Sequence, residues 1–383
     1  MTDASGIIGA YLELNVVFLV VCLAWLSLSR VMDAIGLGHV LTARLHLSRL
    51  LFLLAVAAPA LASGLHALGR RGIADIRSLN LSDFMLAQYL QGNIRMQPSA
   101  MERVVGFHDG LAQTLSGPVG QMLGAALVAG MALMCARLFC AVSRLHTVLK
   151  GSYCWRSFGA VDLRLSDTIR VPFSARTLRR RVIVLPTAML GRDGDLRMAL
   201  SHELQHLRQG DVEWELAISL VQPFLFWNPA FHLWKRHVEE LREAACDRAL
   251  LSRRGYAVAD YCDCLLRVCN DGLRPRGIMA VELPAVALVR PLRGRLACRA
   301  AILLRRRILR VMEGRAERHP RLAFALLSAP LAILTLVVAL AIQKPGAWSE
   351  DRIMLSTIVN LERLRTISAT GAFGSPRAIE PGI

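Results

Sequence analysis

His202, Glu203 and His206 form an H-E-x-x-H sequence, the part of the chain whose residue types and spacing most clearly predict chemistry. On an α-helix, positions i and i+4 lie on one face, so the two histidines can bind a single zinc ion. Glu203 can then reach a zinc-bound water molecule and act as its general base. The alternative is a surface helix on which two unrelated histidines fall at this spacing.

A second acidic segment favours the zinc hypothesis. Residues 238–251 have good helix-forming composition, and within them Glu243 and Asp247 are four residues apart. Glu243 would complete a His₂Glu ligand set and leave a fourth position for water, as in catalytic zinc sites. Asp247 is expected to accept a hydrogen bond from the free ring N–H of one ligand histidine. The alternative is a charged helix face with ordinary i,i+4 ion pairs.

Local signals predict the helix that must carry the histidines. Asp195 is the expected N-cap, and Gly210 is the expected stop after the last turn. Other residues of metal-binding type are explained at least as well by packing. They are His232 and His237, which are alternative ligands by spacing alone, and Cys262 and Cys264, which lack the C-x-x-C spacing of zinc and redox sites.

Composition predicts a membrane protein around these residues. Hydrophobic residues make up 54% of the 383 residues, while the net charge is +17, which excludes a disordered chain and a purely soluble one. Three uncharged runs are long enough to span a bilayer, and a shorter fourth run becomes so if Glu13 and Asn15 lie at its outer end. The predicted spans are residues 16–28 with this extension, 50–68, 116–136 and 322–342.

Basic residues set the predicted orientation. Arg30, Arg44 and Arg49 flank the short loop after the first span, and the segment 144–321 carries most of the excess positive charge. Both are therefore expected in the cytoplasm, with the loop at about 69–115 and both termini outside. All nine cysteines fall in spans or on the cytoplasmic side, so a disulfide framework is not expected.

The uncharged stretch from Leu216 to Trp234 tests this topology. If it crossed the membrane, the two histidines and Glu243 would lie on opposite sides and could not share a metal. Pro223 and the Asn228-Pro229 pair would break a straight helix here. We therefore expect two helical pieces, packed in the domain or dipping into the inner leaflet.

The combination of these pieces resembles the BlaR/MecR-type membrane metallopeptidases, over roughly residues 1–342. The resemblance implies that His202, His206 and Glu243 bind Zn²⁺ and that Glu203 is the catalytic base. It also implies a strand pair before the catalytic helix, whose second strand, ending at Pro186, is either an edge that holds the substrate or a buried core strand. The matching segments are 202–206 with Asp211, 227–229, 242–247, 255–257, 305–308, and upstream 171–173 and 182–186.

The expected fold is a mainly α membrane protein with a cytoplasmic α+β gluzincin-like zinc metallopeptidase domain between the third and fourth spans. The expected parts are three spans in 1–143, the peptidase domain in 144–320, the fourth span in 321–343 and a short extracytoplasmic tail in 344–383. The β-lactam sensors of this family carry a penicillin-binding domain with Ser-x-x-Lys after the fourth span. The tail has no such motif, so direct acylation by a β-lactam is not expected.

The expected function is that of a signal-responsive antirepressor in the bacterial inner membrane, which cleaves a transcriptional repressor, such as one of the helix-turn-helix class, or itself. The alternatives are an HtpX-like quality-control protease and a non-catalytic receptor or scaffold that keeps the fold. The protein substrate and the lipid bilayer are the expected partners.

The Arg-rich region 290–321 is expected to meet anionic lipid rather than nucleic acid, and it is also the candidate region for self-cleavage. Gly120 and Gly124 favour packing within the chain over a homodimer. Residues 81–90 predict an amphipathic helix in the outer loop.

Overall fold

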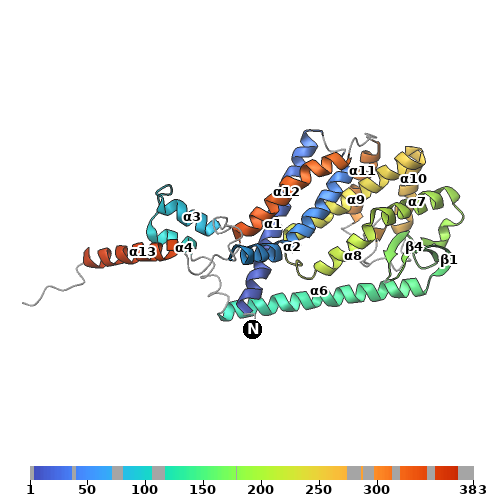
Figure 1. Ribbon diagram of the computed structural model, residues 1–383. Helices are drawn as coiled ribbons and strands as arrows, with labels where there is room; N and C mark the ends of the chain where they lie inside the picture. The colour runs from blue at the N-terminus through green and yellow to red at the C-terminus, as the bar shows by residue number, and fades with distance from the viewer. Residues whose placement is uncertain are drawn as a thin grey trace, which may run out of the picture. The chain divides into compact units, whose positions relative to one another are not determined.

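The computed structural model describes residues 4–36, 40–70, 81–105, 117–177, 179–273, 286–287, 297–312, 320–342 and 350–369 (Figure 1). The chain divides into two compact units, and each is described by itself. One unit comprises Met1–Val21, Leu51–Gly124 and Pro330–Ile383; the other comprises Cys22–Leu50 and Ala125–Ala329.

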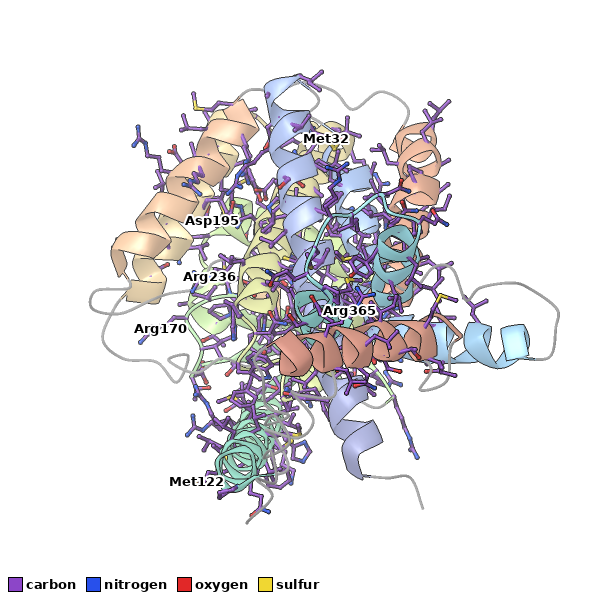
Figure 2. All side chains as sticks on the ribbon, turned by 90° about the vertical axis from the view of Figure 1, so that its left-hand side faces the viewer. Met32, Met122, Arg170, Asp195, Arg236 and Arg365 are labelled. Carbon is purple, nitrogen blue, oxygen red and sulfur yellow. The ribbon has the colours of Figure 1, made fainter. Side chains whose placement is uncertain are left out.

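Among the described residues, four helices are long and apolar enough to cross a membrane: α1 (Ala4–Ala34), α2 (Leu41–Arg70), α6 (Pro118–Lys150) and α12 (Pro320–Ile342). They correspond to the four predicted spans, but α2 begins nine residues earlier than the predicted span and so contains Arg44 and Arg49. Apolar side chains of α6 are exposed, among them Met122 (Figure 2), which suits a helix with a lipid-facing side. The domain division predicted at 143/144 remains a prediction and falls inside α6.

A five-stranded sheet follows α6, in the order β1-β2-β4-β3-β5. The β2 and β4 strands are parallel, and the other neighbours are antiparallel. The strands are β1 (Tyr153–Phe158), β2 (Val161–Ser166), β3 (Phe173–Arg176), β4 (Arg181–Pro186) and β5 (Val286–Ala287). Because β4 is paired on both sides, it cannot offer a free edge to a substrate. That prediction is wrong, and the alternative, a buried core strand, is confirmed.

Five helices complete this unit: α7 (Asp193–Gln209), α8 (Asp211–Val221), α9 (Pro229–Arg254), α10 (Val258–Leu273) and α11 (Ala297–Met312). A core of buried aliphatic residues joins the sheet to α7 and α8, among them Ile183, Leu185, Leu207 and Val212. A second core joins α7 to α9, α10 and α11 through residues such as Met198, Leu250, Leu265 and Val311. The helix with the histidines is thus held on both sides.

The predicted start of α7 is wrong, and its predicted end is confirmed. Asp195 lies inside the first turn rather than at the N-cap, which is Arg192. Its carboxylate is buried and accepts hydrogen bonds at 2.7 and 3.0 Å from Arg267, an ion pair with a distant helix that no local signal indicates. Gly210 ends the helix with φ +68°, a conformation that glycine adopts without strain, and it leads directly into α8.

The stretch from Leu216 to Trp234 consists of two helical pieces, as predicted. Helix α8 ends at Val221, and α9 begins at Pro229, where the Asn228 side chain accepts a hydrogen bond from the Ala230 backbone at 3.0 Å. Proline at the first position of a helix is favoured because its missing N–H would have no partner there. Neither piece is among the four candidate spans, so the break separates α8 from α9 without a fifth span.

In the other unit, the outer-loop segment and the C-terminal tail pack together. Helices α3 (Leu81–Leu90) and α4 (Pro98–Val105) contact α13 (Glu350–Ala369). Leu86, Met101, Leu355 and Val359 form their shared buried cluster. A helix at 81–90 is confirmed, but its apolar residues do not gather on one face, so the amphipathic character predicted for it is wrong. A helix in the tail was not predicted.

Candidate metal centre

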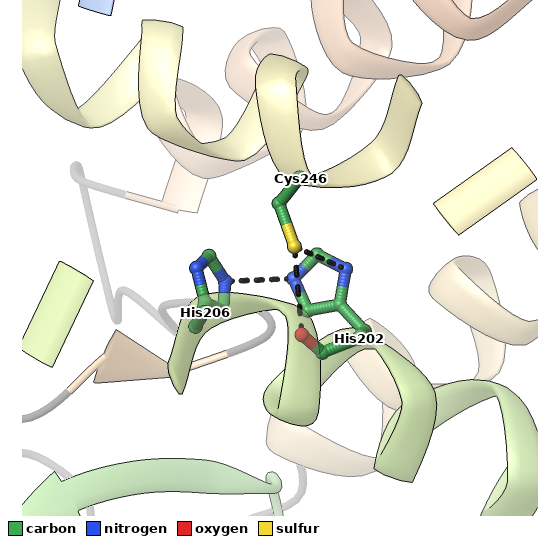
Figure 3. A group of neighbouring side chains, drawn as sticks. All are labelled: His202, His206 and Cys246. Carbon is green, nitrogen blue, oxygen red and sulfur yellow. Dashed lines mark hydrogen bonds between the residues drawn. The ribbon is translucent and has the colours of Figure 1, made fainter. Parts of the chain in front are cut away.

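Helix α7 brings the two histidines of the H-E-x-x-H sequence side by side (Figure 3). The Nε2 atoms of His202 and His206 are 2.9 Å apart, and both side chains are fully buried. Two aromatic nitrogens that face each other at this distance inside a protein can share a cation between them. The i,i+4 prediction from the sequence is thus reproduced in the geometry.

Helix α9 brings Glu243 to the same point. Its Oε2 lies 3.5 Å from His202 Nε2, and its Oε1 lies 3.7 Å from His206 Nε2. The Glu243 side chain is 20% exposed, while both histidines are at 0%. The three residues predicted to bind zinc therefore meet. Of the three, only Glu243 reaches solvent.

Cys246 is a fourth neighbour with a donor atom. Its Sγ, one ring nitrogen of His202 and one of His206 all lie within 4.8 Å of one another. However, the Sγ is 3.5 Å from His202 Nδ1 and 3.4 Å from the His202 carbonyl oxygen, to which the thiol donates (Figure 3). It thus contacts the Nδ1 side of the ring, whereas His206 and Glu243 meet Nε2. Both the Glu243 carboxylate and the Cys246 thiol thus lie near the two histidines, and Glu243 as the third ligand is a proposal.

Each histidine is oriented through Nδ1. His206 Nδ1 lies 2.6 Å from Asp211 Oδ2, and His202 Nδ1 lies 3.0 Å from the Tyr261 hydroxyl and 3.4 Å from Asp247 Oδ1. The Tyr261 hydroxyl donates to Asp247 at 2.5 Å. With Nδ1 engaged in this way, Nε2 is the nitrogen that each ring turns toward the other histidine, and on His202 it also lies 3.3 Å from Arg307 Nη2. Asp247 lies where it was predicted, but Tyr261 was not anticipated.

Arg307 on α11 is the largest omission from the sequence prediction. It binds Asp247 through two nitrogens, each at 2.5 Å, and its Nη1 is 3.2 Å from Glu243 Oε2. Burial raises the pKa of Asp247, but Arg307 outweighs this and holds it at about 2. Burial likewise raises the pKa of Glu243, but His206 and Arg307 hold it well below its usual range. Both carboxylates are therefore anionic at neutral pH, as a metal ligand and its supporting acceptor must be. The run 305–308 was noted for its resemblance, but a single sequence does not show that Arg307 contacts Asp247.

Glu203 supplies the test of whether these residues fit a metal. Its side chain is fully buried, and neither carboxylate oxygen has a hydrogen-bond partner of normal geometry among the described residues, although the Ser174 hydroxyl is near enough to lower its pKa. Burial raises its pKa, opposed by His206, His202 and the Ser174 hydroxyl. A buried carboxylate without a partner is costly unless something polar is meant to meet it. A metal-bound water beside the two Nε2 atoms would satisfy it, and the N, N, O donor set is one that zinc prefers.

The other predicted alternatives lie apart from this group. His232 Nε2 contacts the Phe226 carbonyl oxygen at 2.7 Å, and His237 stacks edge-on against Trp25. Cys264 is buried in the core between α7 and α10, and Cys262 packs at its margin. The packing interpretation of these four residues is therefore confirmed.

Comparison with known protein families finds a match. The family model described as BlaR1 peptidase M56 matches residues 117–298. The match begins just before α6 and includes the sheet, α7 to α10 and thus all five residues proposed for the site from sequence. No curated protein matches the chain significantly.

Proposed function

Since residues 117–298 are of the BlaR1 peptidase M56 type, a family of membrane metallopeptidases, we propose that this protein is a membrane-embedded zinc endopeptidase. One observation carries the proposal. The Nε2 atoms of His202 and His206 and the Glu243 carboxylate converge beside Glu203, a buried carboxylate with no hydrogen-bond partner of normal geometry among the described residues.

The chain's own residues divide the chemistry among them. Zinc, when bound, polarises the scissile carbonyl and lowers the pKa of a coordinated water towards about 7. Glu203 would take a proton from the attacking water and pass it to the leaving amine, a role suited to a carboxylate whose pKa burial has raised. Asp211 holds the ring of His206, and Tyr261 with Asp247 holds the ring of His202. Arg307 keeps Asp247 and Glu243 in place.

We propose that a substrate peptide binds along β3 in the place that β5 takes, because β3, like β4, is paired on both sides. The hydroxyl of Ser174 on β3 lowers the pKa of Glu203. Ser174 pairs with Val286 of β5 in antiparallel register. A strand at this place therefore runs past the catalytic base. In this chain the strand at that place is formed by its own residues 286–287, and self-cleavage remains proposed for the region 290–321.

The cellular role rests on the family resemblance. We propose a signal-responsive antirepressor of the bacterial inner membrane that cleaves a transcriptional repressor, with the catalytic domain in the cytoplasm and both termini outside. Exposed apolar side chains around the α8–α9 connection support contact of this domain with the inner leaflet; they are Leu216, Leu220, Phe224, Trp227 and Leu233. An HtpX-like quality-control protease is the second candidate, and a homodimer remains a proposal.

The test is a Glu203→Gln variant purified in detergent beside the wild type, with unfolded casein and the chain itself as substrates. We expect proteolysis to fall by about 10²–10⁴-fold, the usual contribution of a general base, while bound zinc stays unchanged. A His232→Gln variant, altered outside the site, is the matched control and keeps full activity. If zinc-loaded wild type cleaves neither substrate nor any peptide of a random library, the non-catalytic scaffold replaces the peptidase.

A further inference from the structure

Arg49 of α2 reaches the end of the catalytic helix. It is 4% exposed, and its Nη1 donates to the Gln209 carbonyl oxygen at 3.0 Å. Its Nη2 donates to Asp211 Oδ1, and its guanidinium lies 5.4 Å from the centre of the Trp214 ring. A single side chain from an apolar helix thus contacts the last residue of α7 and the first turn of α8.

Asp211 connects this contact to the metal centre. While Oδ1 accepts from Arg49, Oδ2 lies 2.6 Å from His206 Nδ1. Asp211 and His206 are both fully buried, so water does not compete for either oxygen. The chain of contacts runs without a gap from α2, through one carboxylate, to the ring whose Nε2 faces His202 and Glu243.

We propose that Arg49 is a positioning residue that couples helix α2 to the metal centre by fixing Asp211 and, through it, His206. This inference rests on the proposed zinc site. A carboxylate with a partner on each oxygen has one allowed orientation, and that orientation sets the ring angle and basicity of the ligand histidine. Without Arg49, Asp211 Oδ1 loses its hydrogen-bond donor and only the charge of Arg242 still opposes the carboxylate, so the carboxylate can rotate away from His206.

The coupling has a consequence for regulation. Helix α2 is apolar over a length sufficient to cross a membrane. A shift of α2 along or about its axis moves the guanidinium, and with it the carboxylate that orients His206. By linkage, a position of α2 that favours metal binding is in turn favoured by the bound metal. The contacts from Arg49 through Asp211 to His206 therefore let a movement of a spanning helix change the orientation of a residue at the proposed metal centre.

Arg44 offers a matched control on the same helix. It is 3% exposed, and it pairs with Asp33 at 2.5 Å and with the Ser29 carbonyl oxygen at 3.3 Å, both on α1. Removing Arg44 thus also removes a buried arginine from α2, but not one that contacts Asp211 or a proposed metal ligand.

The experiment measures zinc affinity of the full-length protein in detergent by competition with a chromophoric chelator, for wild type, Arg49→Gln, Arg49→Lys and Arg44→Gln. We expect Arg49→Gln to bind zinc about 10–100-fold more weakly, as is usual when the partner of a ligand histidine is disturbed. Arg44→Gln should bind as wild type does, and Arg49→Lys should lie between. The absorption spectrum of the cobalt-substituted protein should change in Arg49→Gln and, to a smaller extent, in Arg49→Lys, but not in Arg44→Gln.

The apo-protein's thermal midpoint, measured in parallel, separates a loss of folding from a loss of metal affinity. If Arg49→Gln does not fold, Arg49→Lys decides, because it keeps the charge and changes only the geometry. Equal zinc affinities for wild type and the folded Arg49 variants would overturn the coupling while leaving the zinc site intact. A wild type that binds no zinc would overturn the proposed function, and the coupling with it.

Discussion

At the scale of single residues, arginine side chains balance the carboxylates that surround the proposed metal centre. Asp211 is paired with Arg49, Asp247 with Arg307, and Glu215, next to the centre, with Arg242. Removing one member of such a buried pair typically costs about 3–5 kcal/mol, because the other charge is left uncompensated. These arginines therefore belong to the site as much as the ligands do.

His237 gives a residue-scale prediction about pH. Burial, with help from Arg44 and Arg310, lowers its pKa from 6.5 to about 4. The unfolded chain takes up a proton near pH 6.5 and the folded chain only near pH 4, so stability is full above pH 6.5 and declines as the pH falls between these values. Between pH 7.5 and 5 this residue should remove about 2 kcal/mol of stability.

The measurement is the thermal midpoint in detergent at both pH values, for wild type and His237→Gln, which cannot titrate. The variant should lose less stability on acidification than the wild type does. An equal loss in both proteins would mean that His237 is protonated in the folded state as readily as in the unfolded state.

Residue spacing predicted the site only where its members lie on one helix or carry a known motif. His202, Glu203 and His206 are within one turn or so, and Glu243 and Asp247 share a second helix. Tyr261, Arg307 and Arg49 reach the same place from α10, α11 and α2. Their contacts depend on how helices pack across long separations in sequence, which no local period reveals.

At the scale of elements, a glycine in α6 marks its closest approach to the α8–α9 connection. A Cβ added at Gly130 would lie 2.4 Å from Cζ of Phe226. A side chain at this position can therefore be accommodated only if the phenyl ring moves. This contact joins α6 to the connection between α8 and α9.

We expect Gly130→Ala to destabilise the protein when Phe226 is present, because the ring must move. In a Phe226→Ala background the same substitution should be neutral or stabilising, since alanine is the better helix former. The coupling free energy from the double-mutant cycle should be about 1–2 kcal/mol, within the range for residues in contact. Thermal midpoints of the four proteins give this value. Additive effects would show that the two residues do not touch.

Elements with strong local signals were predicted well, and pairing between them was not. The apolar runs, the Gly210 stop and the break at Pro229 act within a few residues and are found in the structure. The predicted span was shorter than α2 because Arg44 and Arg49 interrupt its apolar run. In the structure these arginines form ion pairs with Asp33 and Asp211, so the helix continues through them. The place of β4 in the middle of the sheet depends on β2 and β3, and its β-branched run is compatible with either position.

At the scale of the whole molecule, the outer loop and the tail share one buried cluster, formed by Leu86, Met101, Leu355 and Val359. Segments that pack together must lie on the same side of a membrane. The sequence assigned both to the outside from separate arguments, the positive charges for the loop and the number of spans for the tail. The shared cluster supports the prediction that the loop and the tail lie on the same side of the membrane. Which side that is remains a proposal.

The orientation can be tested with a membrane-impermeant maleimide on intact cells. Asn93→Cys and Asn360→Cys, both at exposed positions, should be labelled from outside. Ser252→Cys at the end of α9 should be labelled only after lysis, and the native cysteines give the background. Labelling of Ser252→Cys in intact cells would reverse the predicted orientation.

The central claim is that α7 and α9 meet at one zinc ion, and the zinc content of the purified protein tests it most directly. Wild type should carry about one zinc per chain. Glu243→Ala should lose most of it, because a His₂ pair alone binds weakly, and Cys246→Ser should keep it, because the thiol contacts the Nδ1 side of His202. Zinc retained in Glu243→Ala but lost in Cys246→Ser would contradict the ligand set. A folded wild type that takes up no zinc would contradict the claim itself.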